Sequence, residues 1–220
     1  MPLTSEQYLR SSLNSSWRVA DLIPQDLSEI RLIFVLESPH VEELATGVPV
    51  VGGAGESALR FLQGAGWTGQ SLGSFVKDKH AAGDARLAVM NVSTMPLQQN
   101  AYKQTSVRPD LTDQEWNWLG ATFRNSTART VDATRDPVAN GVGNLLLGSL
   151  QKRINRLRLA PGSVVVPCGR FARRYVRQLH ELPGEVLSVP HPSRNQWLPQ
   201  KAPAPEKLLR LQELFIECTM

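Results

Sequence analysis

Four short apolar runs recur along the chain, and longer amphipathic stretches separate them. The runs occupy residues 31–38, 86–94, 163–169 and 185–193. The first three are continuously apolar over the length of a strand, which is typical of strands that are buried on both faces. The fourth is a shorter strand pattern that ends in a histidine between two prolines. We therefore expect a sheet that is covered on both sides.

The stretches between these runs carry apolar residues every three or four positions, as amphipathic helices do. We expect helices at residues 5–13, 55–66, 112–125, 140–159, 169–182 and 205–218. We expect a loop at 97–112 and irregular structure at 126–138. Strands that alternate with helices form mainly parallel sheets between two helical layers. The pattern predicts an α/β fold, a three-layer α/β/α sandwich with a mainly parallel four-stranded sheet, formed by residues 1–220 as one domain.

The composition fits an ordinary globular protein, since 41% of the 220 residues are hydrophobic. No run of about 18 apolar residues occurs, so we expect no membrane span. The first residues lack the basic and then apolar pattern of a secretory signal. The two cysteines, Cys168 and Cys218, lie far apart in the sequence, which suits a reducing cytoplasm and leaves a disulfide open. Histidines and cysteines do not cluster at ligand spacing, so we expect no metal and no cofactor.

The charge is distributed unevenly along the chain, whose net charge is +4. No Asp or Glu occurs between Pro137 and His180. The same segment carries eight basic residues: Lys152, Arg153, Arg156, Arg158, Arg170, Arg173, Arg174 and Arg177. Such a segment suits a polyanion such as nucleic acid, and it equally suits solvated helix faces.

Polar side chains follow each of the expected strands at the point where the apolar run ends. The four ends read Glu37-Ser38-Pro39-His40, Asn91-Val92-Ser93, Cys168-Gly169-Arg170 and His191-Pro192-Ser193. In a doubly wound sheet, ligands bind in the crevice beyond the carboxyl ends of the strands. We therefore expect these groups to converge on one site.

The same strand ends carry a family resemblance over residues 31–197. The segment "ESPHVEELATGVPVVGGAG", from Glu37 to Gly55, is followed by "VMNVSTMP", "VVVPCGRFA" and "PHPSRNQW". In this order the four segments resemble the motifs of the uracil-DNA glycosylase superfamily. The first is most similar to the branch that reads Gly-Glu-(Ala/Gly)-Pro-Gly. The resemblance implies a monomeric enzyme that hydrolyses the N-glycosidic bond of a nucleotide flipped out of DNA and leaves an abasic site.

The resemblance also implies roles for the strand-end residues. His191 is expected to donate a hydrogen bond to the departing base, whose negative charge grows as the bond breaks. Glu37 or Glu43 is expected to hold water or to offset the cationic sugar. The side-chain amide of Asn91 offers both a donor and an acceptor to the edge of the base.

A second group of residues is expected to contact DNA on either side of the flipped nucleotide. Backbone amides near Ser38 and Ser193 would bind the flanking phosphates, and Gly169 and Arg170 begin a helix at the same edge. In this family the loop after the histidine inserts into the duplex. Arg194 or Trp197 is therefore expected to wedge the gap that the flipped base leaves.

Three positions depart from the family pattern, and all three are expected to line the base pocket. Ser38 stands where members that have a catalytic aspartate carry it. Val50 stands where the family has a stacking phenylalanine, and His40 replaces the Tyr or Gly that lies next to the C5 edge of the base. We therefore expect the substrate to be uracil or a bulkier modified pyrimidine. Two cysteines also cannot supply the four thiolates of an iron–sulfur cluster, so the cluster of the most similar branch is not expected.

Two functions from other classes remain open from the sequence. A non-catalytic relative would bind DNA or a nucleotide without cleaving it, since Ser38 is a poor general base. A hydrolase of small nucleosides would use the same pocket without a polymer. For a glycosylase, the sequence does not separate DNA repair from defence against foreign, base-modified DNA.

Overall fold

The computed structural model describes most of the chain. The described residues are 2–11, 15–105, 107–124, 129–157, 159, 161–182, 184–198 and 204–220. Arg158 of the basic segment lies outside them.

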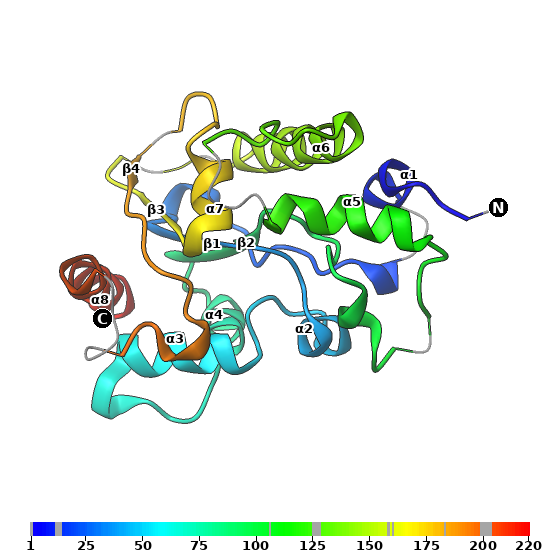
Figure 1. The fold of residues 1–220 in the computed structure, drawn as a ribbon. Coiled ribbons are helices and arrows are strands. Elements are labelled where there is room, and N and C mark those ends of the chain that lie inside the picture. The colour runs from blue at the N-terminus through cyan, green and yellow to red at the C-terminus, as the bar shows by residue number, and fades with distance from the viewer. Residues whose placement is uncertain are drawn as a thin grey trace.

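A four-stranded, all-parallel sheet forms the centre of the fold (Figure 1). Its strands are β1 (Leu32–Leu36), β2 (Leu87–Asn91), β3 (Val164–Pro167) and β4 (Glu185–Val186). Their order in the sheet is β2-β1-β3-β4. In register, Leu36 lies beside Asn91 and Val35 beside Pro167, so three strands end at the same edge. The α/β sandwich predicted from the sequence is confirmed.

Helices cover both faces of the sheet. They are α1 (Ser5–Arg10), α2 (Val41–Thr46), α3 (Gly53–Gln63), α4 (Leu72–Ala81), α5 (Asp113–Arg124), α6 (Pro137–Ile154), α7 (Gly169–Val176) and α8 (Pro205–Thr219). One apolar core joins α1, α5, α6 and α7 to Ile33, Val35 and Val165 of the sheet. The opposite core joins α3, α4 and α8 to Phe34 and Val166. Because adjacent residues of a strand point to opposite faces, continuous apolar runs were required to fill both cores.

Several boundaries differ from those predicted. The chain forms two helices that the sequence reading missed, α2 in the acidic run and α4, where Ser71 caps the amide of Ser74. Helix α6 begins at Pro137 because Asp136 caps it, within the stretch expected to be irregular. The fourth strand is only Glu185–Val186, both exposed, and a single further bridge joins Cys168 to Val189. Short 3-10 turns occupy Ser15–Trp17, Leu27–Glu29, Gly64–Gly66, Gln99–Tyr102 and Ser193–Asn195.

None of the helices among the described residues has both the length and the apolar character needed to cross a membrane. Within the same residues, no group of three or more His, Cys, Asp or Glu side chains is arranged to hold a metal ion. Cys168 and Cys218 are both buried and free, so the disulfide that the sequence left open is not formed.

Candidate active site

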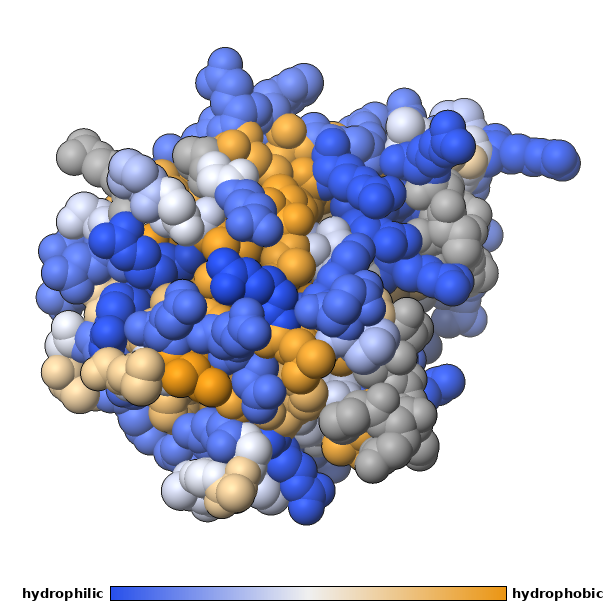
Figure 2. Space-filling view, turned by 90° about the vertical axis from the view of Figure 1, so that its left-hand side faces the viewer, coloured by the Kyte–Doolittle hydropathy of each residue, from blue (hydrophilic) through white to orange (hydrophobic). Residues whose placement is uncertain are grey.

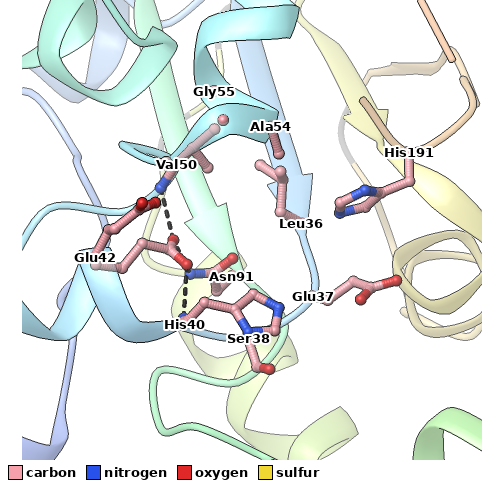
Figure 3. Close-up of a pocket in the computed structure, with 13 residues that line it drawn as sticks. Leu36, Glu37, Ser38, His40, Glu42, Val50, Ala54, Gly55, Asn91 and His191 are labelled. Carbon is pink, nitrogen blue, oxygen red and sulfur yellow. Dashed lines mark hydrogen bonds between the residues drawn. The ribbon is translucent and has the colours of Figure 1, made fainter. Parts of the chain in front are cut away.

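A cavity of about 240 Å³, here called the inner cavity, opens where β1 and β2 end (Figure 3). Seven residues expected to act in catalysis or base binding line it: Glu37, Ser38, His40, Glu43, Val50, Asn91 and His191. The parallel register of β1 and β2 brings the segment after Leu36 and the segment after Asn91 together. Beyond the strands, the amide of Val92 donates to the carbonyl of Leu36 at 3.0 Å, and that of Ser93 donates to the carbonyl of Glu37 at 3.0 Å. The strand ends therefore converge as their positions in the sequence indicated.

Glu37 carries a carboxylate that no described residue binds. Its side chain is partly buried and has neither a hydrogen bond nor an ion pair with the described part of the chain. Burial raises the pKa of Glu37 from 4.5 to about 7, because the charged form loses hydration without gaining a donor. A carboxylate that titrates near neutral pH suits general acid–base chemistry.

His191 faces the same cavity as a neutral imidazole. Burial, helped by repulsion from His40, lowers the pKa of His191 to about 4. The backbone amide of Ser193 donates to Nδ1 at 3.2 Å, so Nδ1 acts as an acceptor. The ring proton is therefore on Nε2, which is left as a donor. Figure 3 shows the ring of His191 directed into the cavity, with Glu37 on the same side.

The close approach of His191 to the sheet depends on Gly169. A Cβ atom at position 169 would lie 2.9 Å from the Cβ of His191, and the backbone there has a φ of +92°. The amide of Gly169 donates to the carbonyl of Val189 at 2.9 Å, which holds the two segments together. Gly169 thus positions the histidine segment, in addition to starting α7 where the sequence placed a DNA contact.

Glu43 is used inside the protein rather than left free. Its Oε2 accepts from the amide of His40 at 2.8 Å, and its Oε1 accepts from the amide of Val50 at 2.6 Å. The amide group of Asn91 lies 3.5 Å from the same Oε1. Burial raises the pKa of Glu43, and these donors oppose the rise. Of the two carboxylates that the sequence offered for binding water, Glu37 is therefore the available one. Glu43 instead links the segments of His40, Val50 and Asn91.

The turn at Val50 is held in an unusual conformation. Val50 has a φ of +59°, which β-branched residues rarely adopt. Its carbonyl accepts from the amide of Gly73 at 3.1 Å. A Cβ at Gly55 would lie 1.9 Å from that carbonyl oxygen, so α3 can pack here only because position 55 is glycine. This glycine serves the packing of the cavity wall.

Three polar groups remain around the inner cavity. The hydroxyl of Ser38 is buried and has no hydrogen-bond partner among the described residues. Asn91 is 2% exposed, and its amide faces the cavity from the end of β2. His40 is exposed at the rim, where it precedes α2. The unsatisfied hydroxyl of Ser38 indicates a position where a ligand would supply the missing partner.

A buried network behind Asn91 was not predicted from the sequence. The guanidinium of Arg153 binds Asp21 at 2.6 Å and donates to the carbonyls of Asn91 and Val92 at 2.8 and 2.6 Å. Asp21 in turn accepts from the amide of Asn91 at 3.3 Å. Arg153 had been counted in the basic segment, and so had Arg174, which is 3% exposed. Both turn inward, and no local pattern around Asp21 marks its partner.

The prediction that Trp197 wedges into DNA is wrong. Trp197 is fully buried, and its indole N–H donates to the carbonyl of Pro190 at 2.7 Å. Its ring packs edge-on against Phe61 of α3, with 6.0 Å between centroids. Arg194, the other candidate, is exposed, and both Arg194 and Asn195 adopt positive φ angles of 56° and 58°. Strained backbone of this kind costs about 1–3 kcal/mol per residue and concentrates at functional sites.

A second, larger cavity of about 750 Å³ lies beside the first and shares Glu37 and His191 with it. Three residues expected to contact DNA line this second cavity: Gly169, Arg170 and Arg194. Ser193, the fourth, is bound to the imidazole of His191 through its backbone and side chain. The cavity that holds Glu37, Asn91 and His191 therefore lies beside a basic surface.

Comparison with known proteins gives no further guide to the function. No protein-family model matches the chain, and no curated protein matches it. What the protein does must be inferred from the cavity itself and from the motifs that form it. The arrangement offers the partly buried carboxylate of Glu37, the neutral imidazole of His191 and the side-chain amide of Asn91, with the exposed carboxylate of Glu42 also on the wall.

Proposed function

We propose that this protein is a DNA glycosylase that hydrolyses the N-glycosidic bond of a flipped-out uracil or modified pyrimidine and leaves an abasic site. The observation that carries the proposal is that Glu37 and His191 line the same cavity without binding each other. One is an unbound carboxylate with a pKa of about 7, and the other is a neutral imidazole that presents Nε2–H. The order of the sequence motifs supports the same reaction.

The chemistry divides between these two side chains. As the bond between C1′ and the base nitrogen breaks, its electron pair leaves with the base, and the sugar becomes cationic. The ionised carboxylate of Glu37 offsets that cation and takes a proton from the water that attacks C1′. The Nε2–H of His191 donates to the carbonyl oxygen of the departing base, where negative charge develops. Glu37 and His191 are largely buried, and the lower local dielectric strengthens both interactions.

The remaining polar groups would recognise the base. The amide of Asn91 is fixed by Glu43 and by the network behind it, so it can select one arrangement of donors and acceptors. The free hydroxyl of Ser38 adds a hydrogen bond. Val50 provides a smaller wall than an aromatic ring would, and His40 lies at an exposed rim. These two features favour a pyrimidine with a large substituent, and such a base would place the enzyme in defence against modified DNA.

The test is base release from labelled oligonucleotides that carry uracil, hypoxanthine, mismatched thymine or cytosines with large C5 substituents. Alkali converts each abasic site into a strand break that can be counted. We expect release from at least one base, and its loss in His191→Ala and Glu37→Gln. Glu29→Gln, an exposed carboxylate at the opposite end of β1, should behave as the wild type.

The other outcomes identify the alternatives. Tight DNA binding without any abasic site would favour a non-catalytic binding protein. Absence of DNA binding even at low salt, together with hydrolysis of free nucleosides, would favour a small-molecule hydrolase.

A further inference from the structure

The second cavity, of about 750 Å³, shares Glu37 and His191 with the inner cavity and extends along α7. A third cavity of about 430 Å³ is lined by residues of α7, β4 and α8, and it shares Arg173, Ser188 and Lys207 with the second cavity. Cavities with shared walls make one path from the site to the edge of the sheet. The second and third cavities together form the outer groove, with the second as its inner part and the third as its outer part.

Positive charge lines this path from end to end. The cationic side chains are Arg170, Arg173, Arg177, Arg194 and Lys207. Positions 170, 173 and 177 fall on one face of a helix, with roughly 5 Å of rise between successive arginines. Among the described residues that line the groove, Glu37 is the one carboxylate, and it lies at the inner end. A charge pattern of this kind favours a linear polyanion.

Apolar side chains also line the groove. In its outer part Val186 is 40% exposed and Leu182 is partly exposed, while Val176, Leu179 and Leu187 are buried. Figure 2 looks onto the side of the molecule that carries β4 and α8, and it shows an apolar band between hydrophilic side chains. In the inner part, the half-buried ring of Phe123 is stacked on Phe171, with 4.6 Å between centroids. An aromatic platform in a basic groove is the usual means of binding single-stranded nucleic acid.

We propose that the outer groove binds a single-stranded segment of DNA that flanks the target nucleotide. A duplex presents phosphates to a protein but keeps its base faces stacked, whereas an unpaired strand presents both. The groove offers surface for both, cations for phosphates and apolar or aromatic walls for base faces. The proposal rests on the proposed function for the position of the target nucleotide. It then follows that the substrate is an unpaired or locally opened strand.

The cations that line the groove indicate a path for this strand. With the reacting sugar beside Glu37, the next phosphates lie near Arg170 and Arg194, which line the inner part of the groove. Farther along, the strand reaches Arg173 and Lys207, which line both parts. The outer groove meets the inner cavity at Glu37 and His191, so the flanking nucleotides on that side of the target should bind more tightly than those on the other.

The experiment measures binding without catalysis. Fluorescence anisotropy would follow oligothymidylates that carry a tetrahydrofuran abasic-site analogue, extended by up to six nucleotides on either the 5′ or the 3′ side. We expect the Kd to fall with length on one side only. The variant R173Q/R177Q should lose this dependence, and its plot of log affinity against log salt should be shallower by about 0.7 for each cation removed. R156Q removes an exposed arginine that does not line the groove and serves as the matched control.

The outcomes separate this proposal from the proposed activity. Equal single-strand affinity in R173Q/R177Q and R156Q, or tighter binding of a fully paired duplex, would overturn the groove proposal. If the double variant unfolds at a lower temperature than R156Q, K207Q, which changes an exposed residue of α8, gives the same test. Normal length dependence without base release from any oligonucleotide would overturn the activity and leave the groove proposal supported.

Discussion

Removal of the charge of Glu37 should stabilise the protein, and the gain should depend on pH. In the folded protein the carboxyl has a pKa of about 7, against 4.5 when it is hydrated. One unit of pKa corresponds to about 1.4 kcal/mol, so the folded state disfavours the ionised form by about 3 kcal/mol. Glutamine has nearly the same shape and cannot ionise. The variant Glu37→Gln should therefore be more stable than the wild type wherever the carboxyl is charged.

The sign follows from the order of the two pKa values. Below pH 4.5 the carboxyl is protonated in both the folded and the unfolded chain, so wild type and variant should have similar free energies of unfolding. Between pH 4.5 and 7 the unfolded chain ionises first, and the wild type loses about 1.4 kcal/mol per pH unit relative to the variant. Above the folded pKa both states are ionised, and the difference stays at its maximum of about 3 kcal/mol.

Urea denaturation at pH 5 and pH 8 measures this difference directly. In thermal denaturation at pH 8 the variant should gain about 6–12 °C in Tm, because 1 kcal/mol corresponds to about 2–4 °C for a chain of this size. Glu29→Gln, which changes an exposed carboxylate, should shift stability by less than about 0.5 kcal/mol at either pH. A stability difference of the same size at both pH values would refute the reasoning, since it would come from packing and not from ionisation.

Three further predictions concern the geometry of the site. If Glu37 is the base, kcat/KM should rise with pH to a plateau above about 7, where the carboxyl is ionised. Because the pKa of His191 is about 4, kcat/KM should not fall again near neutral pH, and a bell-shaped pH profile centred at pH 6 would contradict this. Gly169→Ala and Gly162→Ala should each cost about 1–2 kcal/mol, since both glycines have positive φ. Only Gly169→Ala should lower kcat, because a Cβ there would press on His191, whereas a Cβ at position 162 would meet no atom of the described residues within 4 Å. Arg153→Met should lower the free energy of unfolding in urea by about 1–3 kcal/mol, because the largely buried Asp21 loses its ion pair and keeps the amide of Asn91 as a donor. Equal stability of wild type and variant would exclude that role.

The sheet could be predicted because its signal is local. Runs such as Ile33-Phe34-Val35 are apolar at every position, and only a strand covered on both faces needs that pattern. The convergence of Glu37, Asn91 and His191 followed from the same inference, since parallel strands end at one edge. The short helix α2 was missed because its six residues, Val41–Thr46, include two acids in the first turn that read as a solvated loop.

The parts that could not be predicted depend on contacts between distant segments. Trp197 follows a polar loop, and the sequence does not indicate that its ring meets Phe61 of α3. The same holds for Arg153 and Asp21, which belong to segments far apart along the chain. Glu43 looked equivalent to Glu37 as an acid near the first strand. The distinction comes from the amides that reach it, and those are positioned by the fold.

The left-handed turn at Val50 limits how the specificity of this site can be engineered. Replacement of Val50 by phenylalanine, to restore a stacking surface, would keep a backbone penalty of about 1–2 kcal/mol, and the new ring would start from a Cα whose amide is bound to Glu43. Asparagine or glycine would relieve the strain but would remove apolar surface from the pocket. A designer who wants a new base preference would therefore do better to vary His40, whose side chain is at the open rim and whose backbone is extended.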